Sequence, residues 1–199
     1  MKFPSFFEAK NSLNLFGLKD NFQFLLSLYT KKNLPKILMI TGKKGLGKST
    51  LVNHFLYFIF DKTNYKISSC SAKKSVFHQQ YIDGTFSNII YISGSNFAFA
   101  KIEDIRYLRT KILQSPILNK ERFIVLDDVE LLNTNSLNAL LKTIEDPGKN
   151  NYFILINNKS KPLLETIKSR SLEIRIFLRE DQRLEIIDKL IKLNKIELS

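Results

Sequence analysis

The sequence has few of the residues that build disulfides and metal clusters. Its 199 residues include one cysteine, Cys70, two histidines, His54 and His78, and no tryptophan. A single cysteine cannot form an internal disulfide, and one cysteine with two histidines is too few for the closed zinc sites of proteins. We therefore expect no zinc and no structural metal.

Long apolar runs are also absent. No run approaches the roughly 18 residues that a membrane-spanning helix needs, and the first residues, Met1-Lys2-Phe3-Pro4, lack the apolar stretch of a signal peptide. We expect no membrane partner and a cytoplasmic protein. Hydrophobic residues nevertheless make up 44% of the chain, which is enough for a globular core.

Acidic residues are the minority among the charged ones. There are 31 Lys and Arg against 19 Asp and Glu, which gives a formal net charge of +12. This balance favours acidic partners such as nucleic acid or nucleotide phosphates. Lysine, asparagine, isoleucine and phenylalanine are abundant throughout, however, so a compositional bias would give the same charge without a nucleic-acid-binding face. Charge alone leaves both interpretations open.

One phosphate-binding motif is complete. The apolar run Ile37–Ile40 leads into Gly42-Lys43-Lys44-Gly45-Leu46-Gly47-Lys48-Ser49-Thr50, and an apolar period of helical spacing follows. The spacing G-x-x-x-x-G-K-S between a buried strand and a helix is typical of a P-loop. The alternative is an ordinary strand-to-helix turn that a lysine-rich chain produces by chance.

Each part of this motif has a physical task. Gly42, Gly45 and Gly47 allow positive φ, so that several N–H groups turn toward a phosphate at a helix N-terminus. Lys48 is placed to reach the β- and γ-phosphates, and the hydroxyl of Ser49 to ligate Mg²⁺, with Thr50 as a spare hydroxyl. The motif predicts a nucleotide phosphate and Mg²⁺ as ligands.

An acidic pair, Asp127-Asp128, follows the apolar run Phe123–Leu126. In P-loop proteins an acid at the end of such a strand holds Mg²⁺ through its water shell, because the ion keeps several waters. We expect Asp127 to take this role and Asp128 to act on the attacking water. The alternative is a solvated strand end or a helix cap.

Strand and helix patterns alternate along the chain, which predicts a parallel α/β sheet covered on both faces. Strands are expected at Ile37–Ile40, Ile89–Ile92, Phe123–Leu126, Tyr152–Ile156 and Leu172–Phe177. Helices are expected on both sides of Gly17 within residues 8–32, after the P-loop, from Ile102 to before Pro116, at Asn133–Glu145 and from Glu180. Residues 61–88 show no period and are expected to form an irregular loop.

Four further segments carry a family resemblance. Asn138–Pro147 is similar to the motif NALLKTLEEP, Leu34–Leu38 to a leucine-proline entry, Ile102–Pro116 to an I-x-x-I-R…S-P helix, and Ser169–Ser171 to a serine-arginine-cysteine motif. All four motifs are those of the ATPase module of bacterial clamp loaders, an AAA+ family, which the chain therefore resembles. From Gly17 to about Phe177 the chain resembles most closely the delta-prime subunits of DNA polymerase III.

The resemblance implies a fold, a function and several roles. Residues 1–178 would form an AAA+ nucleotide-binding domain, and residues 179–199 would begin a helical lid. The domain would bind ATP and Mg²⁺, with Asn157 or Asn158 as the sensor of the nucleotide. Arg170 would be an arginine finger that acts in trans on ATP bound to a neighbour. The partners would be the other clamp-loader subunits, the sliding clamp and primed DNA, and the function would be clamp loading in replication.

Departures from the family keep alternatives open. The family's zinc-binding cysteines are missing, Asp128 stands where Glu is usual, and the C-terminal collar is not within these residues. Arg170 could instead be a basic residue that the dipole favours at a helix C-terminus. A catalytic gamma/tau-type subunit is the first alternative function, and a phosphotransferase of another P-loop family is the second.

Overall fold

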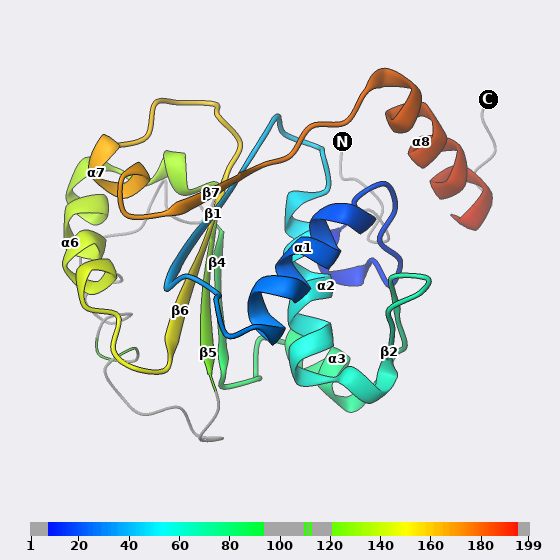
Figure 1. Ribbon diagram of the computed structural model, residues 1–199, viewed down its shortest axis with the longest axis horizontal. Coiled ribbons are helices and arrows are strands. Elements are labelled where there is room, and N and C mark those ends of the chain that lie inside the picture. The colour runs from blue at the N-terminus through cyan, green and yellow to red at the C-terminus, as the bar shows by residue number, and fades with distance from the viewer. Residues whose placement is uncertain (1–7, 94–109, 111, 113–120, 195–199) are drawn as a thin grey trace.

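A computed structural model describes residues 8–93, 110, 112 and 121–194. Its centre is a five-stranded parallel sheet of order β4-β5-β6-β1-β7 (Figure 1). The strands are β1 (Ile37–Thr41), β4 (Ile89–Ser93), β5 (Arg122–Asp127), β6 (Asn151–Asn157) and β7 (Leu172–Arg175). The predicted five-stranded parallel sheet is therefore confirmed.

Helices cover both faces of the sheet. On one face lie α1 (Lys19–Thr30), α2 (Lys48–Phe60) and α3 (Val76–Ile82), and on the other α6 (Thr134–Glu145) and α7 (Glu165–Lys168) (Figure 1). The last helix, α8 (Glu180–Asn194), follows β7 at the edge of the first face. Short 3₁₀ turns, η2 (Ala9–Asn11), η3 (Lys62–Asn64) and η4 (Val129–Leu131), and a small hairpin of β2 (Tyr65–Lys66) and β3 (Ser71–Ala72) complete the described chain.

Strand β1 shows how the sequence builds the two cores. All five of its residues are buried, as expected for a parallel strand with helices on both sides. Because alternate side chains of a strand point to opposite faces, Leu38 and Ile40 pack in the core with α1–α3, whereas Ile37 and Met39 pack in the core with α6 and α7. The strand that precedes the P-loop is thereby fixed from both sides.

The end of β7 and the helix α6 differ little from expectation. Helix α6 begins where the sequence predicts, since the side chain of Asn133 caps it by accepting a hydrogen bond from the N–H of Ser136 at 2.8 Å. Strand β7 ends at Arg175, two residues before the expected Phe177. Of the helix expected from Ile102 to before Pro116, only Thr110 and Ile112 are among the described residues, and both are helical. None of the described helices is long and apolar enough to span a membrane.

The helix expected just before Gly17 is wrong. Residues 12–16 run extended against the hairpin: the N–H of Leu15 donates to the carbonyl of Cys70 at 3.0 Å, and the N–H of Ala72 donates to the carbonyl of Leu13 at 2.9 Å. The apolar spacing of this segment imitates a helix, but pairing with a distant hairpin decides its conformation. The helix after Gly17 is present as α1.

The irregular loop expected over residues 61–88 is only partly correct. This stretch contains the hairpin β2–β3, whose strands have two residues each, and helix α3. Helix α3 is capped by Ser75, whose hydroxyl accepts a hydrogen bond from the N–H of His78 at 3.1 Å. Elements this short leave no periodicity in the sequence.

Candidate nucleotide-binding site

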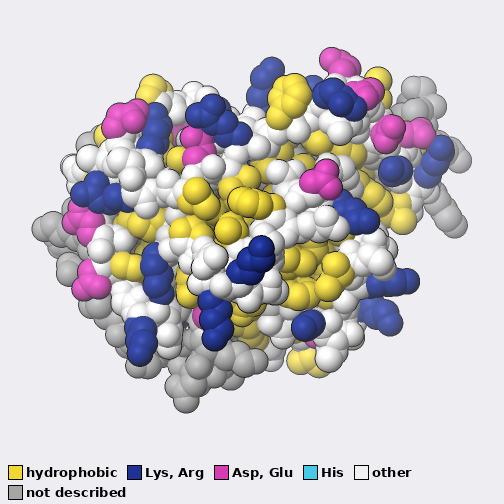
Figure 2. All heavy atoms as spheres, in the orientation of Figure 1, with side chains coloured by type: hydrophobic (Ala, Val, Ile, Leu, Met, Phe, Trp, Pro, Cys, Tyr) yellow, Lys and Arg dark blue, Asp and Glu magenta, His cyan; other side chains and the backbone are white. Residues whose placement is uncertain are grey.

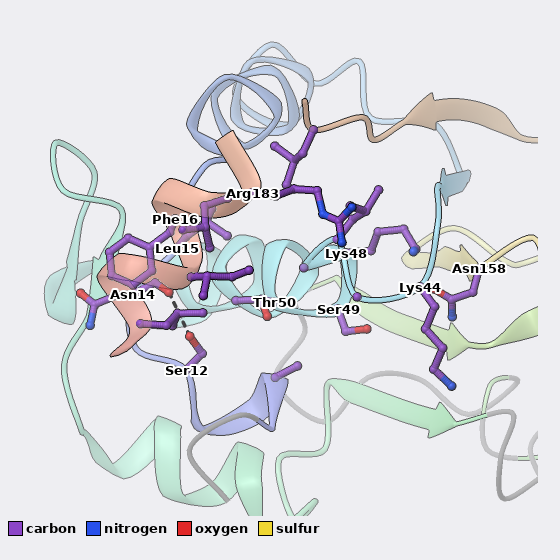
Figure 3. A pocket seen from close by; sticks show the side chains of 18 of the residues that line it. Ser12, Asn14, Leu15, Phe16, Lys44, Lys48, Ser49, Thr50, Asn158 and Arg183 are labelled. Carbon is purple, nitrogen blue, oxygen red and sulfur yellow. Dashed lines mark hydrogen bonds between the residues drawn. The ribbon is translucent and has the colours of Figure 1, made fainter. Parts of the chain in front are cut away.

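A cavity of about 440 Å³ opens at the carboxyl ends of β1 and β5 (Figure 3). Parallel strands bring the loops that follow them to one edge of the sheet, which is where such folds bind ligands. The cavity has three walls: the P-loop, the acids and Asn158 after β5 and β6, and apolar residues of the N-terminal segment and α8. Its lining includes Ser12, Asn14, Leu15, Phe16, Lys44–Thr50, Asp127, Asp128, Asn158, Leu178, Arg183, Ile186, Ile187 and Leu190.

The P-loop has the backbone geometry of an anion site. Gly45 and Gly47 have φ of +84° and +76°, in the left-handed region that a residue with a Cβ rarely adopts. At Gly42 a Cβ would lie 2.7 Å from the carbonyl oxygen of Ile176, so this position also requires glycine. The N–H groups of Gly47, Lys48 and Ser49 donate no hydrogen bond within the described chain, so they are available to a phosphate at the N-terminus of α2.

The Lys48 side chain is buried in the P-loop. Its Nζ donates to the carbonyl oxygens of Gly42 at 2.9 Å and Lys43 at 2.6 Å. Burial lowers the pKa of Lys48, and the nearby carboxylate of Asp127 opposes that shift. Lys48 and Lys44 place two positive charges at this end of the cavity, and Thr50 also lines the cavity.

Ser49 and Asp127 meet as the sequence predicts. The Ser49 hydroxyl donates to Oδ2 of Asp127 at 2.7 Å, although Ser49 lies in the first turn of α2 and Asp127 at the end of β5. The other carboxylate oxygen of Asp127 accepts from the N–H of Asp128 at 3.0 Å. A hydroxyl and a carboxylate that converge beside a phosphate-binding loop fit Mg²⁺, which takes oxygen ligands and few carboxylates.

Tyr91 is a site residue that the sequence analysis missed. Its hydroxyl donates to Oδ2 of Asp127 at 2.5 Å, so two hydroxyls share one carboxylate oxygen. Burial raises the pKa of Tyr91, and the charge of Asp127 adds to the shift, so the phenol stays protonated and remains a donor. Only the pairing of β4 with β5 brings Tyr91 here, and that neighbour relation is not visible in the sequence.

Asp128 and Asn158 line the cavity directly after the ends of β5 and β6. Asp128 has a left-handed backbone, with φ of +55°, and its Oδ1 accepts a hydrogen bond from the Asn158 amide. The buried carboxylate of Glu130, also missed from the sequence, accepts from the N–H of Asn158 at 3.1 Å and fixes this loop. Asn157 points elsewhere: it is buried, and its side-chain oxygen accepts from the N–H of Lys159 at 2.7 Å. Of the two asparagines considered from the sequence, Asn158 lines the cavity.

The apolar wall of the cavity could not be predicted from the sequence. It joins the extended residues Leu15 and Phe16 to Leu178, Ile186, Ile187 and Leu190 of the C-terminal segment. The N-terminal segment and α8 pack closely at Gly17, where a Cβ would lie 2.2 Å from Cδ1 of Ile186. An apolar wall of this kind suits the ring system of a nucleotide whose phosphates lie on the P-loop.

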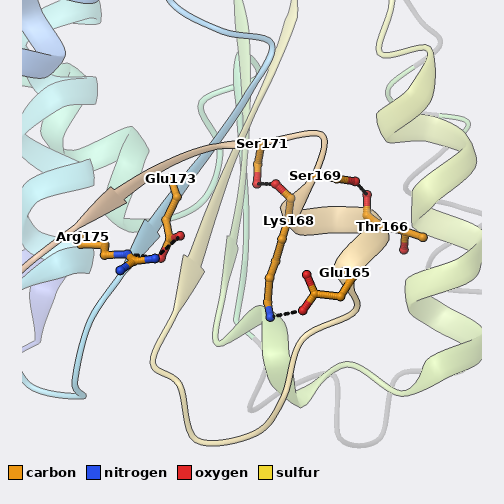
Figure 4. A network of polar contacts seen from close by, with 7 residues as sticks. All are labelled: Glu165, Thr166, Lys168, Ser169, Ser171, Glu173 and Arg175. Carbon is orange, nitrogen blue, oxygen red and sulfur yellow. Dashed lines mark hydrogen bonds and ion pairs between the residues drawn. The ribbon is translucent and has the colours of Figure 1, made fainter.

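Arg170 lies apart from this cavity, in the turn between α7 and β7. Its guanidinium donates to the carbonyl of Thr166 at 3.0 Å and forms an ion pair with Glu145 at 3.1 Å. The first contact is that of a basic residue at a helix C-terminus, as in the alternative interpretation. Other polar contacts hold the same turn, such as Lys168 with Glu165 at 2.6 Å (Figure 4).

The fold and this site define a P-loop protein of the AAA+ type. A RuvB protein of Thermotoga maritima has a TM-score of 0.60 at 18% identity, over 96% of this chain and 57% of that one. A DNA polymerase III gamma subunit-related protein of the same organism has a TM-score of 0.55 at 17% identity, over 84% of this chain and 51% of that one. These likenesses concern the fold alone.

The chain belongs to the family described as DNA polymerase III, delta subunit, whose model matches residues 17–179. A DNA polymerase III subunit gamma of Buchnera aphidicola subsp. Schizaphis graminum is 27% identical over 146 residues, which are 72% of this chain and 39% of that relative. A subunit delta' of Pseudomonas aeruginosa is 26% identical over 136 residues, which are 68% of this chain and 41% of that relative. The chain therefore spans about two fifths of the length of these relatives.

Proposed function

We propose that this chain is the nucleotide-binding module of a DNA polymerase III clamp-loader subunit of the delta-prime type. The observation that carries the proposal is the 2.7 Å contact between Ser49 and Asp127, which joins the P-loop to the acid after β5 in the arrangement that holds a nucleotide and its metal ion. The family to which residues 17–179 belong supplies the biological setting.

Each residue of the cavity then has a role in binding. The N–H groups of Gly47, Lys48 and Ser49 and the ammonium of Lys48 bind the phosphates. Gly45 and Gly47 supply the left-handed backbone of the loop, and Gly42 allows it to lie against Ile176, the residue after β7. Ser49 and Asp127 would hold Mg²⁺, and the ion would supply positive charge that offsets the charge of the phosphates. Asp128 and Asn158 face the place where a water attacks the γ-phosphate, and the Asn158 amide orients the shorter Asp128 carboxylate.

The complex would contain further partners. As a clamp-loader subunit, the chain would assemble with other subunits, offer Arg170 to a neighbour's ATP, and act on the sliding clamp at primed DNA. On the face shown in Figure 2, Lys and Arg are scattered with Asp and Glu among them, so charge singles out no DNA-binding patch on that face. A residue boundary near 178 would separate the nucleotide-binding domain from the helical lid that α8 begins.

A gamma/tau-type catalytic subunit is the second candidate. The complete P-loop and the similarity to a gamma subunit favour it. The aspartate at position 128, one methylene shorter than the glutamate that the family resemblance leads us to expect, favours the delta-prime type. A phosphotransferase of another P-loop family is the weakest candidate, since the chain belongs to the polymerase family.

Two measurements on the full-length protein test these proposals. Titration with a fluorescent ATP analogue should show binding that Lys48→Ala abolishes and that Lys168→Ala, whose ammonium pairs with Glu165 away from the cavity, retains. Equal affinity of the Lys48→Ala variant and the wild type would refute the nucleotide site. Steady-state ATPase, first alone and then with partner subunits and primed DNA, separates the two subunit types, because a catalytic subunit turns over ATP by itself.

A further inference from the structure

The N-terminal segment (residues 9–16) lies outside the central sheet and the helices that cover it, yet it forms part of the cavity wall. Ser12, Asn14, Leu15 and Phe16 of this segment line the cavity (Figure 3). The place of this wall therefore depends on what holds the segment against the rest of the domain. Lys10, near the start of the segment, makes two such contacts, one through its backbone and one through its side chain.

The backbone contact of Lys10 is with α2, the helix that begins at the P-loop. The hydroxyl of Tyr57 donates to the carbonyl oxygen of Lys10 at 2.8 Å. Tyr57 is buried, and burial raises its pKa, so the phenol stays protonated and remains a donor. One helix thus carries Lys48 at its start and, in its last turn, the tyrosine that holds the N-terminal segment.

The side-chain contact of Lys10 is with two aromatic rings. The ammonium lies 5.2 Å from the ring centroid of Tyr91 and 5.9 Å from that of Tyr81. A cation within about 6 Å of a ring centroid is attracted by the negative face of the ring. The hydroxyl of Tyr91 donates to Oδ2 of Asp127 at 2.5 Å. The hydroxyl of Tyr81 donates to Oδ1 of the buried Asn53 in α2, also at 2.5 Å.

These contacts form one continuous path from the N-terminal segment to the acid that follows the P-loop in space. The ring of Tyr91 cannot move without changing two contacts, since the ammonium of Lys10 lies over the ring and the hydroxyl is bonded to Asp127. The same carboxylate oxygen also accepts from Ser49. A shift of the N-terminal segment therefore reaches Asp127, although Lys10 itself does not line the cavity.

We propose that Lys10 is a positioning residue of the nucleotide site, which couples the N-terminal wall of the cavity to the carboxylate that would hold Mg²⁺. Its carbonyl fixes the N-terminal segment on α2, and its ammonium holds Tyr91 in the hydrogen bond to Asp127. This inference rests on the proposed nucleotide and Mg²⁺ site, and it extends that site to a residue outside the cavity.

The role of the ammonium is tested by the Mg²⁺ dependence of ATP binding to the full-length protein. Lys10→Met keeps most of the aliphatic chain and removes the charge. It should raise the Mg²⁺ midpoint by about two- to fivefold, the size expected for the loss of one cation–π contact. The sign is diagnostic, because removal of a nearby positive charge would by itself lower the midpoint through weaker repulsion of Mg²⁺.

Two further variants accompany Lys10→Met. Lys10→Arg should stay near the wild type, because a guanidinium also binds ring faces and the cavity of about 180 Å³ that Lys10 lines with Tyr81 and Tyr91 leaves room for it. Lys62→Met is the matched control. Its ammonium lies 5.6 Å from the ring centroid of Phe58, away from the nucleotide cavity, so its loss should not change the midpoint.

A double-mutant cycle separates positioning from a general effect on the fold. Tyr91→Phe keeps the ring and removes the hydroxyl, so Lys10→Met should shift the midpoint no further in that background. Three results would overturn the role of the ammonium: equal shifts in both backgrounds, a midpoint below that of the wild type in Lys10→Met, or the same midpoint in Lys10→Met and Lys62→Met.

The role of the carbonyl is tested with Tyr57→Phe, which removes the hydrogen bond to Lys10. This variant should bind ATP about fivefold more weakly and bind tripolyphosphate as the wild type does, because tripolyphosphate has no base to contact the wall. Both ligands are measured by competition with a fluorescent ATP analogue. Tyr152→Phe, whose hydroxyl lies away from the cavity, should match the wild type for both ligands.

The outcomes distinguish this inference from the proposed function. An equal loss of affinity for ATP and tripolyphosphate in Tyr57→Phe would assign Tyr57 to the packing of α2 and overturn the role of the Lys10 carbonyl. If the wild type binds both ligands and Lys10→Met and Tyr57→Phe do not differ from it, only this inference fails. If the wild type binds neither ligand, the proposed nucleotide site fails and this inference fails with it.

Discussion

Arg170 and Glu145 form an ion pair, in which Nη2 of the arginine lies 3.1 Å from Oε1 of the glutamate. The pair ties the turn after α7 to the end of α6, yet the two side chains are 42% and 50% exposed. Exposed pairs of this kind contribute only about 0–1 kcal/mol to stability. Arg170 can therefore leave Glu145 for a more strongly charged partner, such as a neighbour's γ-phosphate, at little cost.

The first prediction concerns this arginine. In a complex reconstituted from full-length subunits, Arg170→Ala should leave this chain's own ATP affinity unchanged and lower the ATPase of the complex. An arginine finger accelerates nucleotide hydrolysis by a factor of ~10³–10⁵. The loss in the complex will be smaller where other subunits also supply fingers. Arg170→Lys should fail as well, because an ammonium lacks the planar fork.

Glu145→Gln is the matched control for Arg170. It removes the ion pair but keeps the guanidinium, so the ATPase of the complex should stay near that of the wild type. Wild-type turnover in the Arg170→Ala complex, or an equal loss in the Glu145→Gln complex, would assign Arg170 to the end of α7 as a structural residue.

The second prediction concerns the carboxylate of Asp127. Asp127→Asn should keep nucleotide binding and weaken its dependence on Mg²⁺, because the amide lacks the charge that holds the ion. Tyr91→Phe should shift the Mg²⁺ midpoint in the same direction but by less than about tenfold, since it removes one hydrogen bond of roughly 1 kcal/mol.

Tyr152→Phe serves as the control for Tyr91. Tyr152 lies near the start of β6, at the other end of the sheet, and does not line the cavity. Nucleotide titrations at a series of Mg²⁺ concentrations decide the matter. A Tyr91→Phe protein with the same midpoint as Tyr152→Phe would show that Tyr91 does not position Asp127.

The third prediction concerns Gly17 and the wall of the cavity. Gly17→Ala places a methyl group 2.2 Å from Cδ1 of Ile186 and forces a left-handed backbone, with φ of +71°, on an L-residue. Gly84 has nearly the same φ, +69°, with open space around it, so Gly84→Ala carries the backbone strain of about 1–2 kcal/mol alone. Gly17→Ala should be less stable than Gly84→Ala and bind nucleotide more weakly, as measured by thermal unfolding and titration. Equal behaviour of the two variants would argue against the contact with α8.

The fourth prediction concerns His54, which is buried in α2 with Nδ1 2.9 Å from the hydroxyl of Tyr65. Burial lowers the pKa of His54 to about 4, from a model-peptide value near 6.5. Between these values the unfolded chain binds a proton that the folded chain does not. The neutral imidazole therefore stabilises the fold above about pH 6.5, and this stability, at most roughly 3 kcal/mol, is lost as the pH falls toward 4.

Denaturant unfolding at several pH values between 7 and 4 checks this prediction. His54→Gln should show a shallower loss of the free energy of unfolding over this range than the wild type, because the carboxylates titrate in both proteins. The same slope in both proteins would mean that His54 is protonated in the folded state.

The sequence predicts those parts of the protein whose signals are local. The P-loop, the strands before Gly42 and Asp128 and the helix α6 are each encoded by contiguous residues, and each is found where expected. The meeting of Ser49 with Asp127 follows in addition from the rule that parallel strands bring their carboxyl ends together.

What the sequence did not predict depends on neighbours that are distant in the chain. The extended course of residues 12–16 is decided by hydrogen bonds to Cys70 and Ala72. The role of Tyr91 depends on which strand lies beside β5, and the apolar wall of the cavity depends on where α8 packs. The choice between Asn157 and Asn158 required the backbone of that loop, because adjacent residues at a strand end point in different directions.

The bond between the Leu15 N–H and the Cys70 carbonyl also has a consequence for the order of folding. The P-loop and α2 are formed by residues adjacent in the chain, whereas the wall containing Leu15 forms only after a long loop, including all of α2, has closed. Loop-closure entropy opposes such contacts early in folding, and chains rich in them fold more slowly. During synthesis and refolding, the P-loop and α2 should therefore form before the apolar wall of the cavity.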